Sequence, residues 1–299
     1  MDEGAGSVLR SLSLRSLSLR IAAVAAALTL PLVGLVAPAE AESAYERGPD
    51  PTSASVLENG TFALSTTSVS SLVTGFGGGT IYYPTSTTEG TYGGVVLAPG
   101  FTARSSAYSA VARRVASHGF VVFAIDTNSI YDQPDSRGSQ ILAAVDYLKQ
   151  DASSAVASRL DETRIAISGH SMGGGGTLAA ANQDSSVKAA VALQPWHTDK
   201  TWPGIQVPTM IIGAENDTVA PVATHSIPFY TSMTGAREKA YGEVNNADHL
   251  IANTDDDWQG RLFVTWLKRY VDDDTRYSQF LCPAPSSIYL SDYRHTCPD

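Results

Sequence analysis

The sequence predicts an α/β fold in which a mostly parallel central sheet is flanked by helices. Short apolar stretches with strand character alternate with stretches of helical periodicity along the chain. Residues 120–125 are apolar throughout, which is typical of a parallel strand buried on both faces. The 299 residues, 43% of them hydrophobic, are sufficient for one substantial core.

The expected elements follow from these patterns in chain order. Strands are expected at 80–83, 92–98, 120–125, 165–168, 187–193, 207–213 and 239–244, with one or two outer strands within 62–74. Helices are expected at 105–118, from Ser136 or Ser139 through Leu148, at 177–181, and at 258–271. Ligands of such sheets bind beyond the carboxyl ends of the strands, so the loops that follow these strands are where a site is expected.

The most informative of these loops is Gly169-His-Ser-Met-Gly173, which lies between an expected strand and an expected helix. A G-x-S-x-G sequence in that context is a nucleophile elbow, a strained turn that projects the serine hydroxyl above the sheet. Glycine is needed on both sides because a side chain there would collide with neighbouring backbone. We therefore expect Ser171 to be a nucleophile on an α/β-hydrolase fold. The alternative is a glycine-rich loop that contains a serine by chance.

An activated serine needs a base and a carboxylate that orients the base, in the chain order Ser, Asp or Glu, His. His249 follows the last expected strand and precedes the last expected helix, so it is the expected base, with His225 as its rival. Asp217 follows the strand at 207–213 by a short loop and is the expected acid, with Glu215 as its rival.

The oxyanion hole of such a site consists of two backbone N–H groups. One belongs to the residue after the nucleophile, which is Met172. The other is expected from Phe101, in the Pro99-Gly-Phe-Thr loop that follows the strand at 92–98. Phe101 as an ordinary core aromatic is the alternative.

The N-terminus has the pattern of an export signal. Arg10, Arg15 and Arg20 precede an apolar run at 21–36, which is followed by Ala-Pro-Ala and Ala-Glu-Ala. We expect residues 1–41 to be a signal peptide, cleaved after Ala39 or Ala41, and residues 42–299 to form a single catalytic domain that is secreted. A membrane anchor is the alternative, but the run is shorter than the roughly 20 residues that a span needs.

The composition limits the binding partners that the protein can have. The net charge of −10 argues against a nucleic-acid partner. We expect a monomer that binds neither nucleic acid nor membrane. The two cysteines, Cys282 and Cys297, are expected to form a disulfide that ties down the C-terminal tail, with two free thiols as the alternative.

Several long strings in the chain resemble the actinobacterial cutinases, which include polyester hydrolases that act on polyethylene terephthalate (PET). The strings span residues 45 to 298 and comprise Tyr45-Glu-Arg-Gly-Pro-Asp-Pro-Thr, Gly75-Phe-Gly-Gly-Gly-Thr-Ile-Tyr-Tyr-Pro, Ala98-Pro-Gly-Phe-Thr-Ala, Gly169-His-Ser-Met-Gly-Gly-Gly-Gly, Pro195-Trp-His-Thr-Asp-Lys and Trp266-Leu-Lys-Arg-Tyr-Val-Asp-Asp-Asp-Thr-Arg-Tyr-Ser-Gln-Phe-Leu-Cys-Pro.

The resemblance implies an α/β-hydrolase without a lid and with an open surface groove. It supports Ser171, Asp217 and His249 as the triad and the Cys282–Cys297 bridge. It implies that Phe101, Met172, Trp196 and Val219 line the groove, and His170 is a further candidate for substrate binding. Phe101 and Trp196 are suited to contact a flat ester ring.

No cofactor is expected, and a metal site is expected only weakly. Some relatives bind calcium through three carboxylates, and here Glu215 keeps one of them. Asn245 stands at the position of a second carboxylate, and Ser291 or Asp292 at the position of the third. Fewer charges at such a site would weaken calcium binding.

The expected function is therefore that of a secreted serine esterase, a cutinase or polyesterase able to hydrolyse PET. One alternative is a general lipase or short-chain carboxylesterase without activity on polymers. Another is a catalytically silent binding protein on the same fold.

Overall fold

The computed structural model describes residues 43–297, so the expected signal peptide at 1–41 lies outside the described residues. The strands are β1 (Leu64–Val69), β2 (Gly79–Pro84), β3 (Tyr92–Ala98), β4 (Phe120–Ile125), β5 (Leu160–His170), β6 (Ala190–Leu193), β7 (Thr209–Ala214), β8 (Lys239–Val244) and β9 (Leu290–His295). The α-helices are α1 (Ser109–Ser117), α2 (Pro134–Gln150), α3 (Ser154–Ala157), α4 (Met172–Gln183), α5 (Ser226–Ser232) and α6 (Asp257–Tyr270), and the 3₁₀ turns are η1 (Ser55–Leu57), η2 (Ser105–Tyr108), η3 (Ile251–Asn253) and η4 (Thr275–Phe280).

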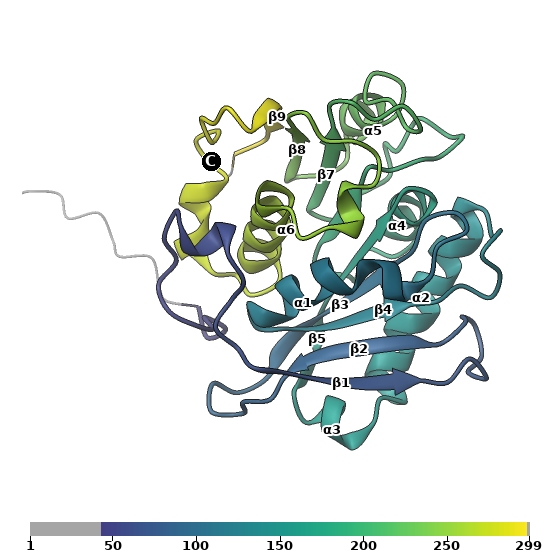
Figure 1. Ribbon diagram of the computed structural model, residues 1–299, viewed down its shortest axis with the longest axis vertical. Helices are drawn as coiled ribbons and strands as arrows, with labels where there is room; N and C mark the ends of the chain where they lie inside the picture. Colours follow the sequence, from purple (N-terminus) through teal and green to yellow (C-terminus); the bar gives the residue numbers. More distant parts are fainter. Residues whose placement is uncertain (1–42, 298–299) are drawn as a thin grey trace, which may run out of the picture. The chain divides into compact units, whose positions relative to one another are not determined.

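The strands form one sheet in the order β1-β2-β4-β3-β5-β6-β7-β8-β9 (Figure 1). The pairs from β4 through β3, β5, β6 and β7 to β8 are parallel, whereas β1, β2 and β9 pair antiparallel at the two edges. The mostly parallel sheet of the α/β-hydrolase fold is thus confirmed. The loops after β3, β5, β7 and β8 leave the same edge of the sheet because these strands run in the same direction.

Helices cover both faces of the sheet, and the strand residues alternate between two cores. In β3, Val95 and Leu97 pack into the core that contains side chains of α1 and α6, whereas Val96 and Ala98 pack into the core that contains α2, α4 and α5. This alternation follows from the period-2 geometry of a strand. Among residues 43–297, the structure has no helix long and apolar enough to cross a membrane.

Three helix starts differ from the sequence predictions. Helix α4 begins at Met172 rather than at Thr177, so it starts directly after the serine of the elbow. Helix α2 begins at Pro134 rather than at a serine, because proline at the first helical position loses no hydrogen bond and already has helical φ. The predicted helix at 105–118 is divided into η2 and α1, so Tyr108 lies at the junction, as the residue just before α1. Tyr108 is buried in the same core as the helix residues Val111 and Val115.

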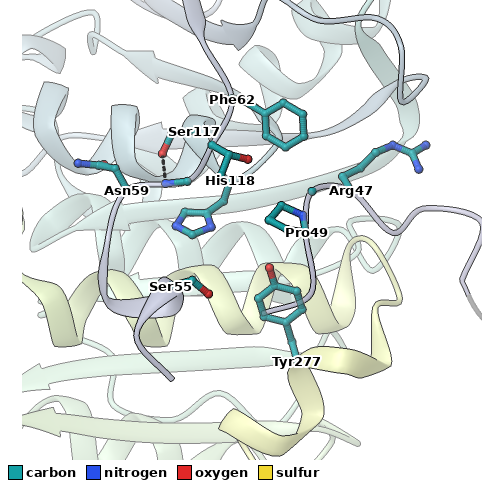
Figure 2. A pocket seen from close by; sticks show the side chains of 11 residues that line it. Arg47, Pro49, Ser55, Asn59, Phe62, Ser117, His118 and Tyr277 are labelled. Carbon is teal, nitrogen blue, oxygen red and sulfur yellow. Dashed lines mark hydrogen bonds between the residues drawn. The ribbon is translucent and has the colours of Figure 1, made fainter. Parts of the chain in front are cut away.

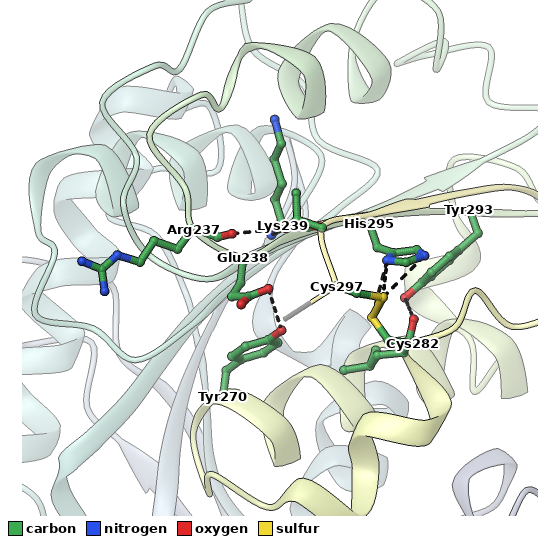
Figure 3. Close-up of a disulfide and its surroundings, with 10 residues drawn as sticks. Arg237, Glu238, Lys239, Tyr270, Cys282, Tyr293, His295 and Cys297 are labelled. Carbon is green, nitrogen blue, oxygen red and sulfur yellow. Dashed lines mark hydrogen bonds between the residues drawn. A yellow bond between two sulfur atoms is a disulfide. The ribbon is translucent and has the colours of Figure 1, made fainter. Parts of the chain in front are cut away.

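Strand β9 was not predicted. It pairs antiparallel with β8 at the sheet edge, and none of its residues is fully buried. A disulfide between Cys282 and Cys297, with Cα atoms 5.7 Å apart, joins the segment that follows η4 to the segment that follows β9 (Figure 3). The bridge expected from the sequence is therefore present, and it anchors the strand that closes this edge.

Candidate active site

Ser171 lies at a sharp turn between β5 and α4 in a strained backbone conformation. Its φ of 55° is in the left-handed region, which non-glycine residues rarely adopt. The neighbouring glycines leave no room for side chains: a Cβ at Gly169 would lie 2.4 Å from the Gly173 carbonyl oxygen. A Cβ at Gly173 would lie 2.5 Å from the carbonyl oxygens of Ala98 and Pro99. The turn therefore has the geometry of a nucleophile elbow.

The structure brings Ser171, His249 and Asp217 into one hydrogen-bonded chain. Ser171 Oγ lies 2.9 Å from His249 Nε2, and His249 Nδ1 lies 2.7 Å from Asp217 Oδ2. All three residues are buried, although they come from three different loops at the carboxyl edge of the sheet. The rival histidine, His225, stacks on Trp196 with ring centroids 6.1 Å apart.

Hydrogen bonds at Oδ1 hold the Asp217 side chain in place and keep Oδ2 directed at His249. The backbone N–H groups of Val219 and Ala220 donate to Asp217 Oδ1 at 2.8 and 2.7 Å. Burial raises the pKa of Asp217, but the hydrogen bonds from His249 and the two backbone N–H groups outweigh it, so the pKa lies below the ordinary value. The carboxylate is thus ionised at neutral pH and able to stabilise a positive charge on His249. The rival acid, Glu215, instead accepts the backbone N–H of Asn246 at 2.8 Å.

The two expected oxyanion donors come from the start of α4 and from the loop that follows β3. Met172 is the first residue of α4, where N–H groups have no partner within the helix. Arg137 supports the loop that carries Phe101. Its side chain is fully buried and donates to the carbonyl oxygens of Pro99 and Ile130 at 3.0 and 2.9 Å. The loop is thus fixed by a charge-assisted donor rather than left to move freely.

The expected groove residues occupy different depths. Phe101 and Val219 are exposed to 46% and 55%. Met172 and Trp196 are half-buried, and the Trp196 backbone N–H donates to the Ser171 carbonyl at 2.9 Å. His170 differs from expectation: it is only 3% exposed, and its Nε2 lies 2.7 Å from the carbonyl oxygen of His249. The ring therefore lies inside the protein, between Tyr108 and the His249 backbone, and is not open to a substrate.

Two exposed apolar side chains near the site were missed in the sequence. Tyr131 is 62% exposed and lies edge-on to Phe101, with ring centroids 5.8 Å apart. Leu250 follows His249 and is 60% exposed. Exposed apolar residues in loops after strands were an available signal for both, since such loops were already where a site was expected.

One small pocket lies away from the site. It measures about 40 Å³ and lies between the N-terminal segment, the end of α1 and η4, lined by Arg47, Phe62, His118 and Tyr277 among others (Figure 2). A volume of that size has room for water but not for an aromatic ester.

The weak calcium candidates do not form a carboxylate cluster. Asn245 Nδ2 donates to the Ile288 carbonyl at 2.7 Å, Ser291 Oγ to Glu243 at 2.7 Å, and Asp292 pairs with Arg294 at 2.6 Å. Within residues 43–297, the group of three metal-ligating side chains that lie together is Cys282, His295 and Cys297, and its two cysteines form the disulfide. The residues do not fit a calcium ion, and no chemical step involves one.

A strained serine, a hydrogen-bonded histidine and a buried carboxylate at the carboxyl edge of this sheet define a serine hydrolase with the α/β-hydrolase fold. The sequence model of the family described as "PET hydrolase-like" matches residues 39–298. The chain belongs to this family of cofactor-independent serine hydrolases and is an ester hydrolase of the cutinase type.

Curated relatives align with this chain over most of their own length. The chain is 52% identical over 292 residues to "Bis(hydroxyethyl) terephthalate hydrolase" from Streptomyces coelicolor, an alignment that covers 95% of this chain and 94% of that protein. It is 54% identical over 268 residues to "Cutinase est1" from Thermobifida alba, covering 88% and 90%. It is 51% identical over 292 residues to "Cutinase cut1" from Thermobifida fusca, covering 96% and 91%.

Proposed function

We propose that the chain is a secreted, monomeric polyester hydrolase that cleaves aromatic and aliphatic esters, PET included, by two-step acyl transfer. The observation that carries the proposal is the unbroken hydrogen-bond chain from Ser171 through His249 to Asp217. Gly100, which precedes the exposed Phe101, lies next to Ser171. The names of the relatives support esters of terephthalic acid and cutin as the substrate class.

In the first step Ser171 Oγ attacks the ester carbonyl carbon while His249 Nε2 takes its proton. Asp217 holds the protonated ring by the 2.7 Å hydrogen bond at Nδ1. The tetrahedral oxyanion accepts hydrogen bonds from the N–H groups of Met172 and Phe101. His249 then gives its proton to the leaving alcohol, and the acyl group remains on Ser171.

In the second step His249 takes a proton from water, and the hydroxide so formed attacks the acyl carbon. The acid product leaves when His249 returns that proton to Ser171 Oγ. The helix α4 begins at Met172, so the positive end of its dipole faces the oxyanion in both steps.

Exposed apolar side chains in the loops near the serine would suit a flat, extended substrate. Phe101 and Tyr131 form an exposed aromatic pair, and Trp196, Val219 and Leu250 supply further apolar surface. An aromatic ester ring can stack on or lie edge-on to such side chains, which contributes about 0.5–1.5 kcal/mol per ring pair beyond area burial.

The test uses the mature protein, residues 42–299, on three substrates: amorphous PET film, bis(hydroxyethyl) terephthalate and p-nitrophenyl butyrate, with Ser171→Ala as the control. We expect aromatic acid products from the film, lost in Ser171→Ala. Turnover of the two soluble esters without release from the film would restrict the function to a small-ester hydrolase. Inactivity on all three substrates would refute the proposed site.

The N-terminal signal and the oligomeric state have tests of their own. Expression of the full chain in a secreting host should release a protein that begins after Ala39 or Ala41, and retention of the uncleaved chain in the cell would contradict secretion. Light scattering should give the mass of one chain.

A further inference from the structure

Two buried polar side chains beside the site, those of Tyr108 and His170, have no part in the mechanism as proposed. Both are almost completely buried, at 1% and 3% exposure. Their contacts are polar: the Gly100 backbone N–H donates to Tyr108 Oη at 2.9 Å, and Tyr108 Oη lies 2.8 Å from His170 Nδ1. His170 Nε2 lies 2.7 Å from the carbonyl oxygen of His249. A chain of three hydrogen bonds therefore runs from Gly100 to His249.

The direction of each hydrogen bond follows from the chemistry of its ends. A carbonyl oxygen only accepts, so the proton of the His170 ring is on Nε2. Burial lowers the pKa of His170 to about 3, so the ring is neutral and Nδ1 is left to accept. Tyr108 then donates to Nδ1, and its oxygen accepts from Gly100. Burial raises the pKa of Tyr108 to about 12, so the hydroxyl keeps its proton.

The two ends of this hydrogen-bond chain adjoin the oxyanion loop and the base, and the reaction needs these two groups at a fixed distance from each other. Gly100 precedes Phe101, whose N–H is a proposed oxyanion donor, and the carbonyl at the other end belongs to the base. Gly100 also lies close to the nucleophile. A Cβ at Gly100 would lie 3.0 Å from Ser171 Cβ, 3.1 Å from His170 Nδ1 and 3.3 Å from Tyr108 Oη.

We propose that Tyr108 and His170 are positioning residues that couple the oxyanion loop to the backbone of the base. This inference rests on the proposed function. Without the tyrosine hydroxyl, the Gly100 N–H and His170 Nδ1 both lose their partner in a buried place, and each such loss favours a shift that brings in water or another partner. A displacement of about 1 Å in a catalytic group can cost roughly 100-fold in rate.

A purely structural role predicts a different result, and the chain offers a matched control. Tyr92 is likewise fully buried, and its hydroxyl donates one hydrogen bond, to the Ser86 carbonyl at 3.1 Å. Tyr92 lies at the start of β3, whereas the proposed site lies beyond its end. Tyr92→Phe thus removes a buried hydroxyl without touching the proposed machinery.

The experiment measures kcat and KM for p-nitrophenyl butyrate in the parent, Tyr108→Phe, His170→Phe, the double variant and Tyr92→Phe. We expect Tyr108→Phe to lower kcat by about 10- to 100-fold with KM within about twofold, because the hydroxyl acts on geometry rather than on binding. Tyr92→Phe should keep the parental kcat while its melting temperature falls as in Tyr108→Phe. The double variant should be no more than about threefold below the lower single variant, because both changes interrupt one chain.

Amide hydrogen exchange provides a readout that does not depend on activity. The Gly100 amide should exchange slowly in the parent and in Tyr92→Phe, and at least tenfold faster in Tyr108→Phe. Parental kcat in Tyr108→Phe, or effects that multiply in the double variant, would overturn the inference. His170→Phe tests the same chain if Tyr108→Phe does not fold. Failure of the proposed function itself is seen separately, as a parent that hydrolyses the ester no faster than Ser171→Ala, and that result would overturn both.

Discussion

Replacement of Asp217 by asparagine should nearly abolish turnover, because the structure dictates how the new amide must lie. The backbone N–H groups of Val219 and Ala220 donate to Asp217 Oδ1 at 2.8 and 2.7 Å. In Asp217→Asn these two donors keep the amide oxygen in place, so the amide NH₂ faces His249 Nδ1. Nδ1 must then accept a hydrogen bond, and the ring proton moves to Nε2, which faces Ser171 Oγ at 2.9 Å. A ring protonated there cannot take the serine proton.

The wrong tautomer in a serine triad costs roughly 10⁴-fold in kcat, or about 5 kcal/mol of barrier height. The assay is steady-state hydrolysis of p-nitrophenyl butyrate, with circular dichroism to confirm the fold. Glu215→Gln is the matched control, since Glu215 is the rival acid and should retain turnover within a few-fold of the parent. If Asp217→Asn remains within tenfold of the parent while Glu215→Gln loses turnover, the acid is Glu215 and the reasoning is wrong.

Three further predictions concern the groove, the pH dependence of stability and the disulfide. Tyr131→Ala should lower the ratio of PET-film product release to p-nitrophenyl butyrate turnover severalfold, because the aromatic pair contacts a polymer more than a small ester. Tyr289, which is also exposed but stacks on Trp258 with ring centroids 5.7 Å apart, is the control, and Tyr289→Ala should keep the parental ratio. A parental ratio in both variants would contradict a role of the aromatic pair in polymer binding. Burial lowers the pKa of His118 from 6.5 to about 4, so the unfolded chain binds more protons between these values and the free energy of unfolding should fall by about 3 kcal/mol as pH drops through that window. Melting curves at pH 8, 6 and 4.5 test this, and His118→Gln should show a smaller loss than the parent; equal losses would exclude His118 as the cause. The Cys282–Cys297 bridge closes a loop of sequence separation 15. Its reduction should lower the free energy of unfolding by about 3 kcal/mol and the melting temperature by roughly 6–12 °C. Scanning calorimetry with and without reductant measures this shift, and equal melting temperatures would refute the prediction.

The central strands were predictable because they are buried, and buried strands consist mostly of apolar residues. Strands β3, β4 and β8 have the bounds expected from their apolar runs. Strand β9 was not predictable in this way: its residues are only partly buried, and it is specified by pairing with β8 and by the disulfide. An edge strand buries little, so the local sequence carries little signal for it.

The site was predictable where its chemistry is local. The elbow needs glycine at 169 and 173 for steric reasons that the sequence displays directly. His249 and Asp217 could be ranked above His225 and Glu215 by their places after strands, but position alone left both rivals open. The hydrogen bonds of the structure favour His249 and Asp217.

The sequence by itself determined the α/β class, the order of its main strands, the elbow and the residue types around it, because strand burial and the steric limits of a tight turn act over a few neighbouring residues. Only the tertiary structure decided that His170 points inward, that Tyr108 reaches it across 62 positions of the chain, and that Tyr131 lies against Phe101. These contacts depend on the packing of distant segments at one edge of the sheet, and a hydrogen bond between such segments leaves no periodic trace in the sequence.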